Sequence, residues 1–282
     1  MEITTKIGCS VFCAYCPQKK LLEAYPKRSQ ELLMSFDTFK TCIDKIPLKE
    51  NLWFCGMCEP FLNPDCTKMI LYAGGRGHRI SVSTTLVGVS LADIDLLEQM
   101  SLGGFGVHLP SAEGLEKIDI DESYLGVLQR VIKSKLPAYF FAHAENVDPR
   151  VLPLFKGSDV EIQKRKLITR AGNVGSMRSP RKRIGILKCE RGMRSNILLP
   201  NGDVVLCCMD YGLQHILGNL LRSDYNSLYQ SKEFLKVQKG LRDVSSDILC
   251  RRCDQFAREI LLIQWMNIFI KRIASILFAR KA

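Results

Sequence analysis

The chain has 282 residues, of which 46% are hydrophobic, so it can bury a large core as one domain or as one domain with a small appendage, and general disorder is excluded. Its formal net charge of +11 indicates an anionic partner, such as a phosphorylated or nucleotide-linked substrate, a nucleic acid or an acidic membrane surface. No basic stripe is interleaved with stacking aromatic residues, so we do not expect that partner to be a nucleic acid.

The twelve cysteines of the chain need a chemical explanation. The first residues show no basic start followed by an apolar stretch, so no secretory signal is predicted and a cytoplasmic location is expected. In a reducing compartment, metal ligation or thiol chemistry is more common than a disulfide framework. The spacing of the cysteines must therefore distinguish these uses.

Six β-rich segments alternate with segments of helical spacing over the first two-thirds of the chain. Strands are predicted at residues 2–8, 52–54, 79–84, 104–109, 138–142 and 160–163, and helices at residues 36–46, 66–73, 91–100 and 124–134. This order predicts an α/β fold with β–α units repeated around a parallel sheet. Six strands are fewer than a closed eight-stranded barrel requires.

Three cysteines with the spacing C-x3-C-x2-C follow the first strand, at Cys9, Cys13 and Cys16. Three thiolates on one tight loop can hold three irons of a 4Fe-4S cube and leave the fourth iron open for a cofactor, whereas most clusters have four cysteine ligands. A zinc loop is the alternative, but zinc sites favour paired C-x2-C knuckles that supply four ligands.

This loop resembles the C-x3-C-x-aromatic-C loop of the radical SAM superfamily, and the resemblance covers roughly residues 1–165. In that family the loop follows the first strand of a partial (β/α)6 TIM-like barrel. The resemblance implies that Cys9, Cys13 and Cys16 ligate a 4Fe-4S cluster, and that Tyr15 lies near the adenine of bound S-adenosylmethionine (SAM).

A second point of resemblance is Gly-Met-Cys-Glu-Pro at residues 56–60, after the second strand. In relatives, a Gly-rich stretch ending in Glu-Pro contacts the methionyl amino group, which implies this role for Glu59. Cys58 replaces the usual second glycine and forms a C-x2-C pair with Cys55. No second pair lies nearby in sequence to complete a metal shell, so we interpret the pair as part of the cofactor-binding turn.

Polar residues end the next two strands, at the edge where α/β sheets bind ligands. Ser83, Thr84 and Thr85 close the third strand, and we predict that Ser83 and Thr85 contact the cofactor. His108 closes the fourth strand and is a candidate catalytic residue, although a buried core histidine would give the same pattern. Arg170, after the last strand, is a candidate contact for an anion or a hydroxyl group.

The organisation changes after about Gly172, where a Gly-, Ser-, Pro- and Arg-rich stretch at residues 173–183 predicts a linker. Two apolar segments around Asn201-Gly202 then predict a β-hairpin. We therefore predict a barrel over residues 1–172, a small β-hairpin/helix module that holds an auxiliary cluster over residues 173–258, and an amphipathic helix over residues 259–282.

Four further cysteines fall within this module, at Cys189, Cys207, Cys250 and Cys253. Four thiolates saturate one cluster, and they would equally suit a structural zinc ribbon. The arrangement resembles the SPASM module, or its shortened form, twitch, found behind radical SAM barrels. This resemblance implies that the four cysteines ligate a single auxiliary 4Fe-4S cluster, which brings the expected total to two clusters.

Cys208, directly after a proposed ligand, is a candidate catalytic thiol that could return a hydrogen atom to a substrate radical. Free cysteines more often pack as small buried hydrophobes.

The resemblance implies reductive cleavage of SAM, with an electron from a flavodoxin- or ferredoxin-type donor, and hydrogen abstraction from a substrate. An alcohol-carbon radical becomes a ketone when it loses a proton and an electron, which a buried cluster can accept. The compact layout is similar to that of radical SAM aminocyclitol dehydrogenases, so we predict oxidation of a small polyol, sugar or glycoconjugate. The alternatives are a radical epimerase with a cysteine hydrogen donor, a ribosomal-peptide-modifying enzyme, and a zinc-binding protein without enzymatic activity.

The apolar stretches of residues 259–282 are interrupted by Lys271 and Arg272, and they are too short to span a bilayer as one segment of roughly 20 residues. A helix there would pack on the barrel or on a second copy of the chain, or would lie in an acidic membrane interface as a peripheral contact.

Overall fold

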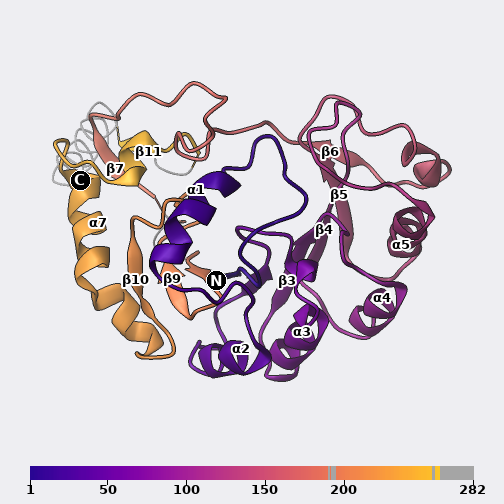
Figure 1. The fold of residues 1–282 in the computed structure, drawn as a ribbon, viewed down its shortest axis with the longest axis horizontal. Coiled ribbons are helices and arrows are strands. Elements are labelled where there is room, and N and C mark those ends of the chain that lie inside the picture. The colour runs from indigo at the N-terminus through magenta and orange to yellow at the C-terminus, as the bar shows by residue number, and fades with distance from the viewer. Residues whose placement is uncertain (190, 192–194, 256–257, 261–282) are drawn as a thin grey trace, which may run out of the picture.

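The computed structural model describes residues 1–189, 191, 195–255 and 258–260. Its centre is a sheet of six parallel strands that are paired in chain order, as the sequence predicts (Figure 1). The strands are β1 (Glu2–Ile3), β2 (Leu52–Phe54), β3 (Ile80–Thr84), β4 (Gly104–His108), β5 (Ala138–Ala142) and β6 (Ile162–Lys164).

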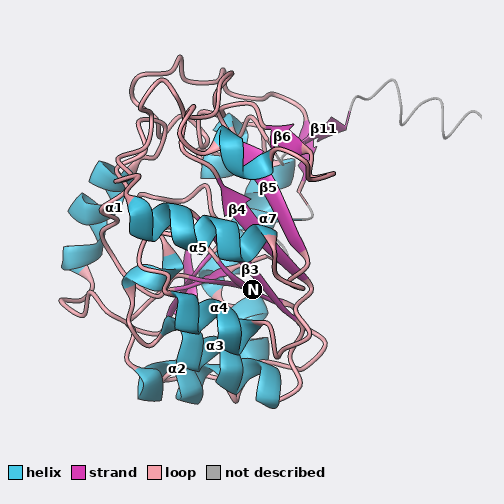
Figure 2. Ribbon diagram, turned by 90° about the vertical axis from the view of Figure 1, so that its right-hand side faces the viewer, coloured by secondary structure: helices cyan, strands magenta, loops and turns pink. Residues whose placement is uncertain are grey.

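Helices cover the outer face of this sheet (Figures 1 and 2). The side chains of Ser35, Ser90 and Asp121 accept backbone N–H groups at the starts of three of them, which fixes where those helices begin. Apolar residues spaced three or four apart then face the sheet. The helices of the barrel are α1 (Gln18–Ala24), α2 (Phe36–Ile43), α3 (Cys66–Gly75), α4 (Leu91–Leu97) and α5 (Glu122–Ile132).

The predicted first strand is shorter than expected. Residues 2–8 alternate like a strand, but only Glu2 and Ile3 pair within the sheet. The Thr4 hydroxyl then accepts the N–H of Met57, and the N–H of Ile7 bonds the carbonyl of Leu32, so the chain leaves the sheet toward a loop. Helix α1 was not predicted, because seven residues give too little periodicity to detect.

The predicted hairpin is present and extends the barrel sheet. It comprises β8 (Ile197–Leu198) and β9 (Asp203–Val205), and Gly202 at the turn has a φ of 81°, which glycine adopts without strain. The next strand, β10 (Ile216–Asn219), pairs with β9, and β8 pairs in parallel with β1. Strands β10, β9 and β8 therefore continue the same sheet beyond β1 (Figure 1).

Helix α7 (Lys232–Arg242) covers the hairpin module and begins at Ser231, whose hydroxyl accepts the N–H of Phe234. The module is fastened to the barrel by side chains as well as by the sheet, because Arg28 donates to Asp203 at 2.6 Å. The short 3-10 helices of the chain are Tyr25–Lys27, Pro60–Leu62, Leu152–Phe155, Tyr225–Gln230 and Leu249–Arg252.

The expected helix over residues 259–282 is wrong at its start. Strand β11 (Arg258–Ile260) pairs antiparallel with β7 (Ile186–Lys188), so Glu259 and Ile260 are in a strand. Residues 261–282, on which the prediction of a membrane or protein contact rests, lie outside the described residues. None of the described helices is long and apolar enough to cross a membrane.

Candidate active site

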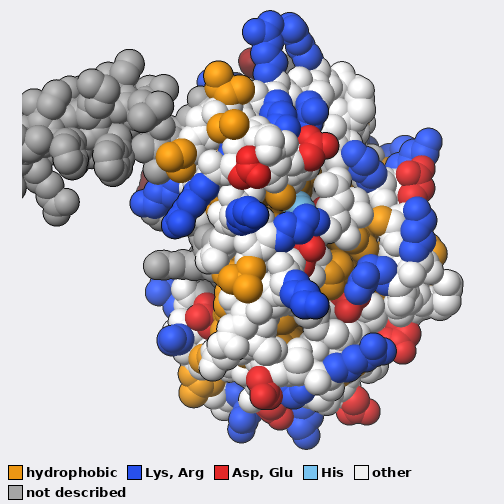
Figure 3. Space-filling model, turned by 90° about the vertical axis from the view of Figure 1, so that its left-hand side faces the viewer, with side chains coloured by type: hydrophobic (Ala, Val, Ile, Leu, Met, Phe, Trp, Pro, Cys, Tyr) orange, Lys and Arg blue, Asp and Glu red, His pale blue; other side chains and the backbone are white. Residues whose placement is uncertain are grey.

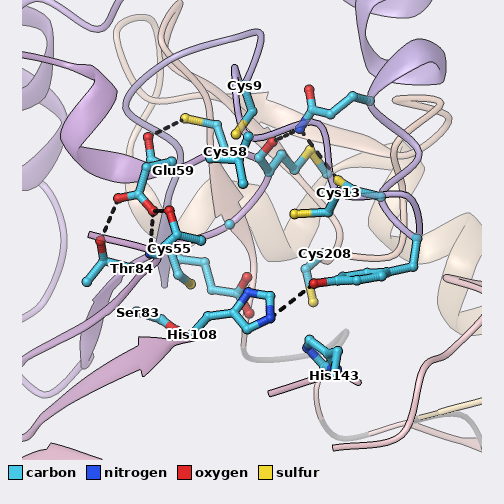
Figure 4. A pocket seen from close by; sticks show the side chains of 18 of the residues that line it. Cys9, Cys13, Cys55, Cys58, Glu59, Ser83, Thr84, His108, His143 and Cys208 are labelled. Carbon is cyan, nitrogen blue, oxygen red and sulfur yellow. Dashed lines mark hydrogen bonds between the residues drawn. The ribbon is translucent and has the colours of Figure 1, made fainter. Parts of the chain in front are cut away.

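A cavity of about 260 Å³ lies at the carboxyl ends of the barrel strands. Its lining comes from the loop that carries Cys9, Cys13 and Cys16, the turn after β2, the ends of β3 and β4, the loop after β6 and the hairpin module. Figure 4 shows several of these side chains facing one space. The predicted residues that line it are Cys9, Cys13, Tyr15, Cys16, Glu59, Ser83, Thr85, His108, Arg170 and Cys208.

The loop that carries the three cysteines is held by backbone hydrogen bonds to residues 115–117. The N–H of Ala14 bonds the carbonyl of Leu115, and the N–H of Lys117 bonds the carbonyl of Val11, both at 2.7 Å. Phe12 adopts a left-handed conformation with φ of 44°, which is strained for a residue with a side chain. This tight path turns Cys9 and Cys13 toward the cavity (Figure 4).

The three thiols suit a cluster by their chemistry and their surroundings. Burial, followed by the nearby thiols of Cys16 and Cys9, raises the pKa of Cys13 to about 12, so the Cys13 sulfur lies within electrostatic reach of the other two. Iron would supply the positive charge that stabilises the thiolates. In the part of the chain that the structure describes, no three His, Cys, Asp or Glu side chains converge closely enough to hold a single metal ion. A 4Fe-4S cube requires less convergence, because each thiolate binds a separate iron.

Tyr15 is fixed in the cavity wall by a partner that the sequence did not reveal. Its hydroxyl donates to Glu116 at 2.6 Å and lies 3.1 Å from Nε2 of His108, while Ser111 donates its N–H and its hydroxyl to the other Glu116 oxygen. Burial would raise the pKa of Glu116, but hydrogen bonds from His108, Tyr15 and Ser111 outweigh it and hold the pKa at about 2. Glu116 is 101 residues from Tyr15, so no local pattern could have found it.

Glu59 organises the end of β3. Its carboxylate accepts hydrogen bonds from the hydroxyl groups of Thr84 and Thr85 at 2.7 Å, from the N–H of Thr85 at 2.6 Å and from the N–H of Phe61 at 3.2 Å (Figure 4 shows part of this set). These four donors occupy most of what a carboxylate can accept. The expected contact with the methionyl amino group stays a prediction, and the structure adds a positioning role for Glu59.

Replacing Glu59 with glutamine is expected to destabilise the fold by about 1–3 kcal/mol, because the amide NH2 would face donors that then lose their acceptor. Urea unfolding of the full chain, compared with the variant, measures this difference. An unchanged unfolding midpoint would contradict the positioning role. Asp65→Asn serves as the matched control, because no hydrogen bond of the Asp65 carboxylate is found at the start of α3.

His143, after β5, is a cavity residue that the sequence analysis missed, because a lone histidine in a polar loop gives no signal. Its ring centroid lies 5.0 Å from that of His108 and 5.1 Å from that of Tyr15. Its buried Nδ1 has no hydrogen-bond partner within the described residues. Burial, then the charges of His108, Arg170 and Arg165, lower the pKa of His143 to about 4, so the imidazole is neutral at pH 7.

A neutral, buried His143 is expected to make the protein sensitive to acid. Because the folded-state pKa of about 4 lies below the ordinary value of 6.5, the stability from the neutral ring is complete above pH 6.5 and is lost as the pH falls toward 4. Between pH 7 and pH 5, the melting temperature of the wild type should therefore fall by roughly 2–4 °C more than that of the variant His143→Phe. Parallel pH profiles of the two proteins would contradict this.

Arg170 enters the cavity from a strained turn. Arg170 and Ala171 have φ of 51° and 57°, and Gly172 continues the left-handed conformation. The carboxylate of Asp254, the residue after Cys253, holds the turn by accepting the N–H groups of Thr169 and Ala171. Strain of this kind persists where surrounding structure fixes it, often at functional sites. The proposed auxiliary-cluster loop thus fixes the position of Arg170.

Cys208 belongs to the hairpin module and lines the cavity (Figure 4). Burial raises the pKa of its thiol to about 12, and the nearby carboxylate of Glu2 adds to this rise, while Arg191 opposes it. Glu2 on β1 forms an ion pair with Arg191. The Cys208 thiol is therefore protonated, which is the form required of a hydrogen-atom donor.

The four cysteines predicted to hold the auxiliary cluster are all buried in the module. Burial raises the pKa of Cys250 to about 12, and Cys189 and Cys253 contribute to the rise. Cys207 in turn lies within electrostatic reach of Cys250. Four buried thiols from segments up to 64 residues apart are the donor set that a fully ligated cluster needs, and their role as its ligands stays a prediction.

Comparisons with known proteins agree with this arrangement. Residues 189–254 match the family model of SPASM, an iron–sulfur cluster-binding domain, whereas no curated protein sequence matches the chain. The structure is similar to that of BtrN in complex with AdoMet and 2-DOIA, with 16% identity and a TM-score of 0.60, over 90% of this chain and 92% of that chain.

Two further solved structures have TM-scores of 0.60 and are similar over 90% of this chain. They are anSMEcpe with bound AdoMet and Kp18Cys peptide, at 13% identity over 86% of that chain, and Streptococcus suis SuiB bound to precursor peptide SuiA, at 10% identity over 70% of that chain.

The chain thus shares with BtrN, anSMEcpe and SuiB its fold, a partial barrel with a parallel sheet followed by an antiparallel hairpin module. Residues 189–254 match the SPASM model and the fold is shared with these structures, as the sequence analysis predicts, while membership of the radical SAM superfamily stays a prediction. At these identities the likeness concerns the fold, and the substrate must be inferred from the cavity.

Proposed function

We propose that the protein cleaves SAM reductively and oxidises an alcohol of a small polyol, sugar or glycoconjugate to a ketone, with the auxiliary cluster as electron acceptor. One observation carries the proposal: a single cavity is bordered by the Cys9–Cys16 loop and by Cys208, which adjoins the proposed auxiliary ligand Cys207. A substrate in that cavity would lie between the two cluster sites.

When bound, SAM and the two clusters supply the radical and the electron transfer. Cys9, Cys13 and Cys16 would hold the first cluster, and the four cysteines of the module would hold the second. Tyr15, Ser83 and Thr85 would contact SAM, and Glu59 would meet its amino group. Their polar groups lie at fixed positions in the cavity wall, which serves orientation of the reacting carbon and exclusion of water.

Oxidation of an alcohol also releases the hydroxyl proton. The Nδ1 atom of His143 is buried at the cavity and has no partner within the described residues, so it is placed to hydrogen-bond that hydroxyl group, although a pKa of about 4 makes the ring too weak a base to keep the proton. Arg170 would orient the hydroxyl group, and His108, bonded to Tyr15, would keep the wall in place. Electrons would enter from a flavodoxin- or ferredoxin-type donor.

The proposal is tested with anaerobically purified full chain, SAM and dithionite. We expect roughly eight iron and eight sulfide per chain, release of 5′-deoxyadenosine, and a product two hydrogens lighter than its polyol. BtrN, which is similar in fold, was solved with AdoMet and 2-DOIA, so aminocyclitols are a reasonable first set of substrates. Zinc in place of iron, or no 5′-deoxyadenosine from iron-loaded protein, would refute the proposal.

Radical epimerisation is a second candidate, favoured by the protonated thiol of Cys208 in the cavity. The variant Cys208→Ala distinguishes the two reactions. If the reaction is oxidation, the variant should retain ketone formation within about twofold, because the electron leaves through the cluster and no hydrogen atom returns. Incorporation of deuterium at carbon in deuterated water, lost in Cys208→Ala, would instead establish epimerisation.

A further inference from the structure

The excess positive charge of the chain is concentrated in one segment. Residues 161–194 contain eleven Lys and Arg residues and two Glu residues, so they carry +9 of the net +11. The segment leaves β6 and crosses above the barrel to β7 (Figure 1). Three of its arginines, Arg165, Arg170 and Arg191, line the cavity. Part of this charge therefore faces the cavity.

Two of these arginines have no carboxylate partner in the part of the chain that the structure describes. Arg191 pairs with Glu2, but neither Arg165 nor Arg170 forms an ion pair among the described residues. The other carboxylate in the cavity wall, Glu59, already accepts four hydrogen bonds. The cavity thus contains positive charge that the described protein groups do not balance.

The proposed cluster sites would balance the positive charge of one of the two arginines. Arg170 lies within electrostatic reach of Cys16 and Cys208, beside both cluster loops, where thiolate charge would balance it. Arg165 lies elsewhere, after β6, with its guanidinium carbon 3.6 Å from the ring centroid of Phe141. Its charge helps to lower the pKa of His143, which shows that the positive potential reaches the part of the cavity beside β5 and β6.

The guanidinium of Arg165 retains hydrogen-bonding capacity. Its contact with the Gln163 side chain is long, at 3.4 Å, and stacking on Phe141 uses the face of the group rather than its N–H donors. A planar fork of N–H donors matches the oxygens of phosphate. Exposed Lys164 and Lys166 flank it, and Figure 3 shows Lys and Arg side chains around a hollow in which a His side chain is visible.

We infer that the substrate carries a phosphate or diphosphate group, and that Arg165 binds this group at the β5–β6 side of the cavity. The inference rests on the proposed function, because it specifies which polyols or sugars the cavity accepts. Basic residues at the surface would raise the local concentration of such an anion. A soluble sugar phosphate and a lipid-linked sugar phosphate share this chemistry.

The test uses iron-loaded full chain with SAM and inorganic pyrophosphate as the probe, with binding measured by calorimetry. Arg165→Gln is expected to weaken pyrophosphate binding at least tenfold, which corresponds to about 1.4 kcal/mol. Arg178→Gln is the matched control, because it removes the same charge from an exposed residue outside the cavity wall. Iron content shows whether each variant is folded and loaded.

Three results would overturn the inference: no saturable binding to the wild type, equal affinity in the wild type and Arg165→Gln, or equal losses in both variants. Competition then identifies the source of the phosphate. Displacement of pyrophosphate by glucose 1-phosphate supports a soluble substrate. Displacement only by phosphatidylcholine vesicles that contain a polyprenyl phosphate supports a lipid-linked one, and displacement by neither contradicts the inference.

The same wild-type preparation separates this inference from the proposed function. If it releases 5′-deoxyadenosine but pyrophosphate binding does not depend on Arg165, the anion site is wrong and the proposed function stands. If binding depends on Arg165 but no 5′-deoxyadenosine forms, the phosphate site stands and the proposed function is wrong.

Discussion

A variant with Cys9, Cys13 and Cys16 all replaced by alanine is expected to release no 5′-deoxyadenosine above background when it is incubated anaerobically with SAM and dithionite. The loop would lose every proposed ligand of the open cluster, so iron should fall from roughly eight to roughly four per chain. Iron analysis and chromatography of the reaction mixture measure both quantities on one sample.

A matched control removes buried thiols without touching the loop. Cys42 and Cys66 are buried in the barrel core, away from the cavity wall, so Cys42→Ala combined with Cys66→Ala should keep the full iron content and SAM cleavage. If the triple loop variant still forms 5′-deoxyadenosine, or if the control loses as much iron, the assignment of the loop as the cluster site fails.

The variant that combines Cys250→Ala with Cys253→Ala is expected to lose iron and product formation. Loss of two of four ligands should remove the auxiliary cluster and about four irons. Product formation should fall by about 100-fold or more, while 5′-deoxyadenosine continues to form, because the electron acceptor is lost but the first site is intact. A loss of roughly 2.7 kcal/mol in transition-state stabilisation corresponds to this factor.

The neighbouring Cys208→Ala variant is the control for this experiment, because Cys208 is buried in the same module but is not a proposed ligand. It should retain the second set of irons. Circular dichroism of each variant shows whether the module remains folded. Full iron content in Cys250→Ala combined with Cys253→Ala would show that these residues do not ligate the cluster.

The sequence predicted the order of the barrel strands well, because the central ones are short β-rich segments bounded by turns and separated by segments of helical spacing. Strands β2 and β5 have the predicted bounds, and His108 closes β4 as expected. The hairpin was equally clear, since Asn201-Gly202 lies between two apolar segments. Strand β11 was missed, because its three residues, Arg-Glu-Ile, have no strand pattern and run directly into the apolar stretch from which a helix was predicted.

The candidate site was predicted only as far as local motifs reach. The cysteine loop and the Glu59 turn are continuous in sequence, whereas Glu116 reaches Tyr15, and His143 and Arg165 reach the cavity, only through tertiary packing. No spacing rule connects Tyr15 to Glu116, because their contact depends on the loop of residues 111–117 folding back on the cluster loop. Such partners become visible only when the chain is folded.

The pairing of β8 with β1 has a consequence for electron transfer. Transfer rates fall steeply with distance, so two redox centres on separately tumbling domains would exchange electrons only in their closest arrangements. Here Glu2 and Ile3 pair on one side with β2, beside the turn that carries Glu59, and on the other with the hairpin that leads to Cys207. The backbone ladder therefore holds the two proposed cluster sites on one continuous sheet, so the gap between them is a property of that sheet.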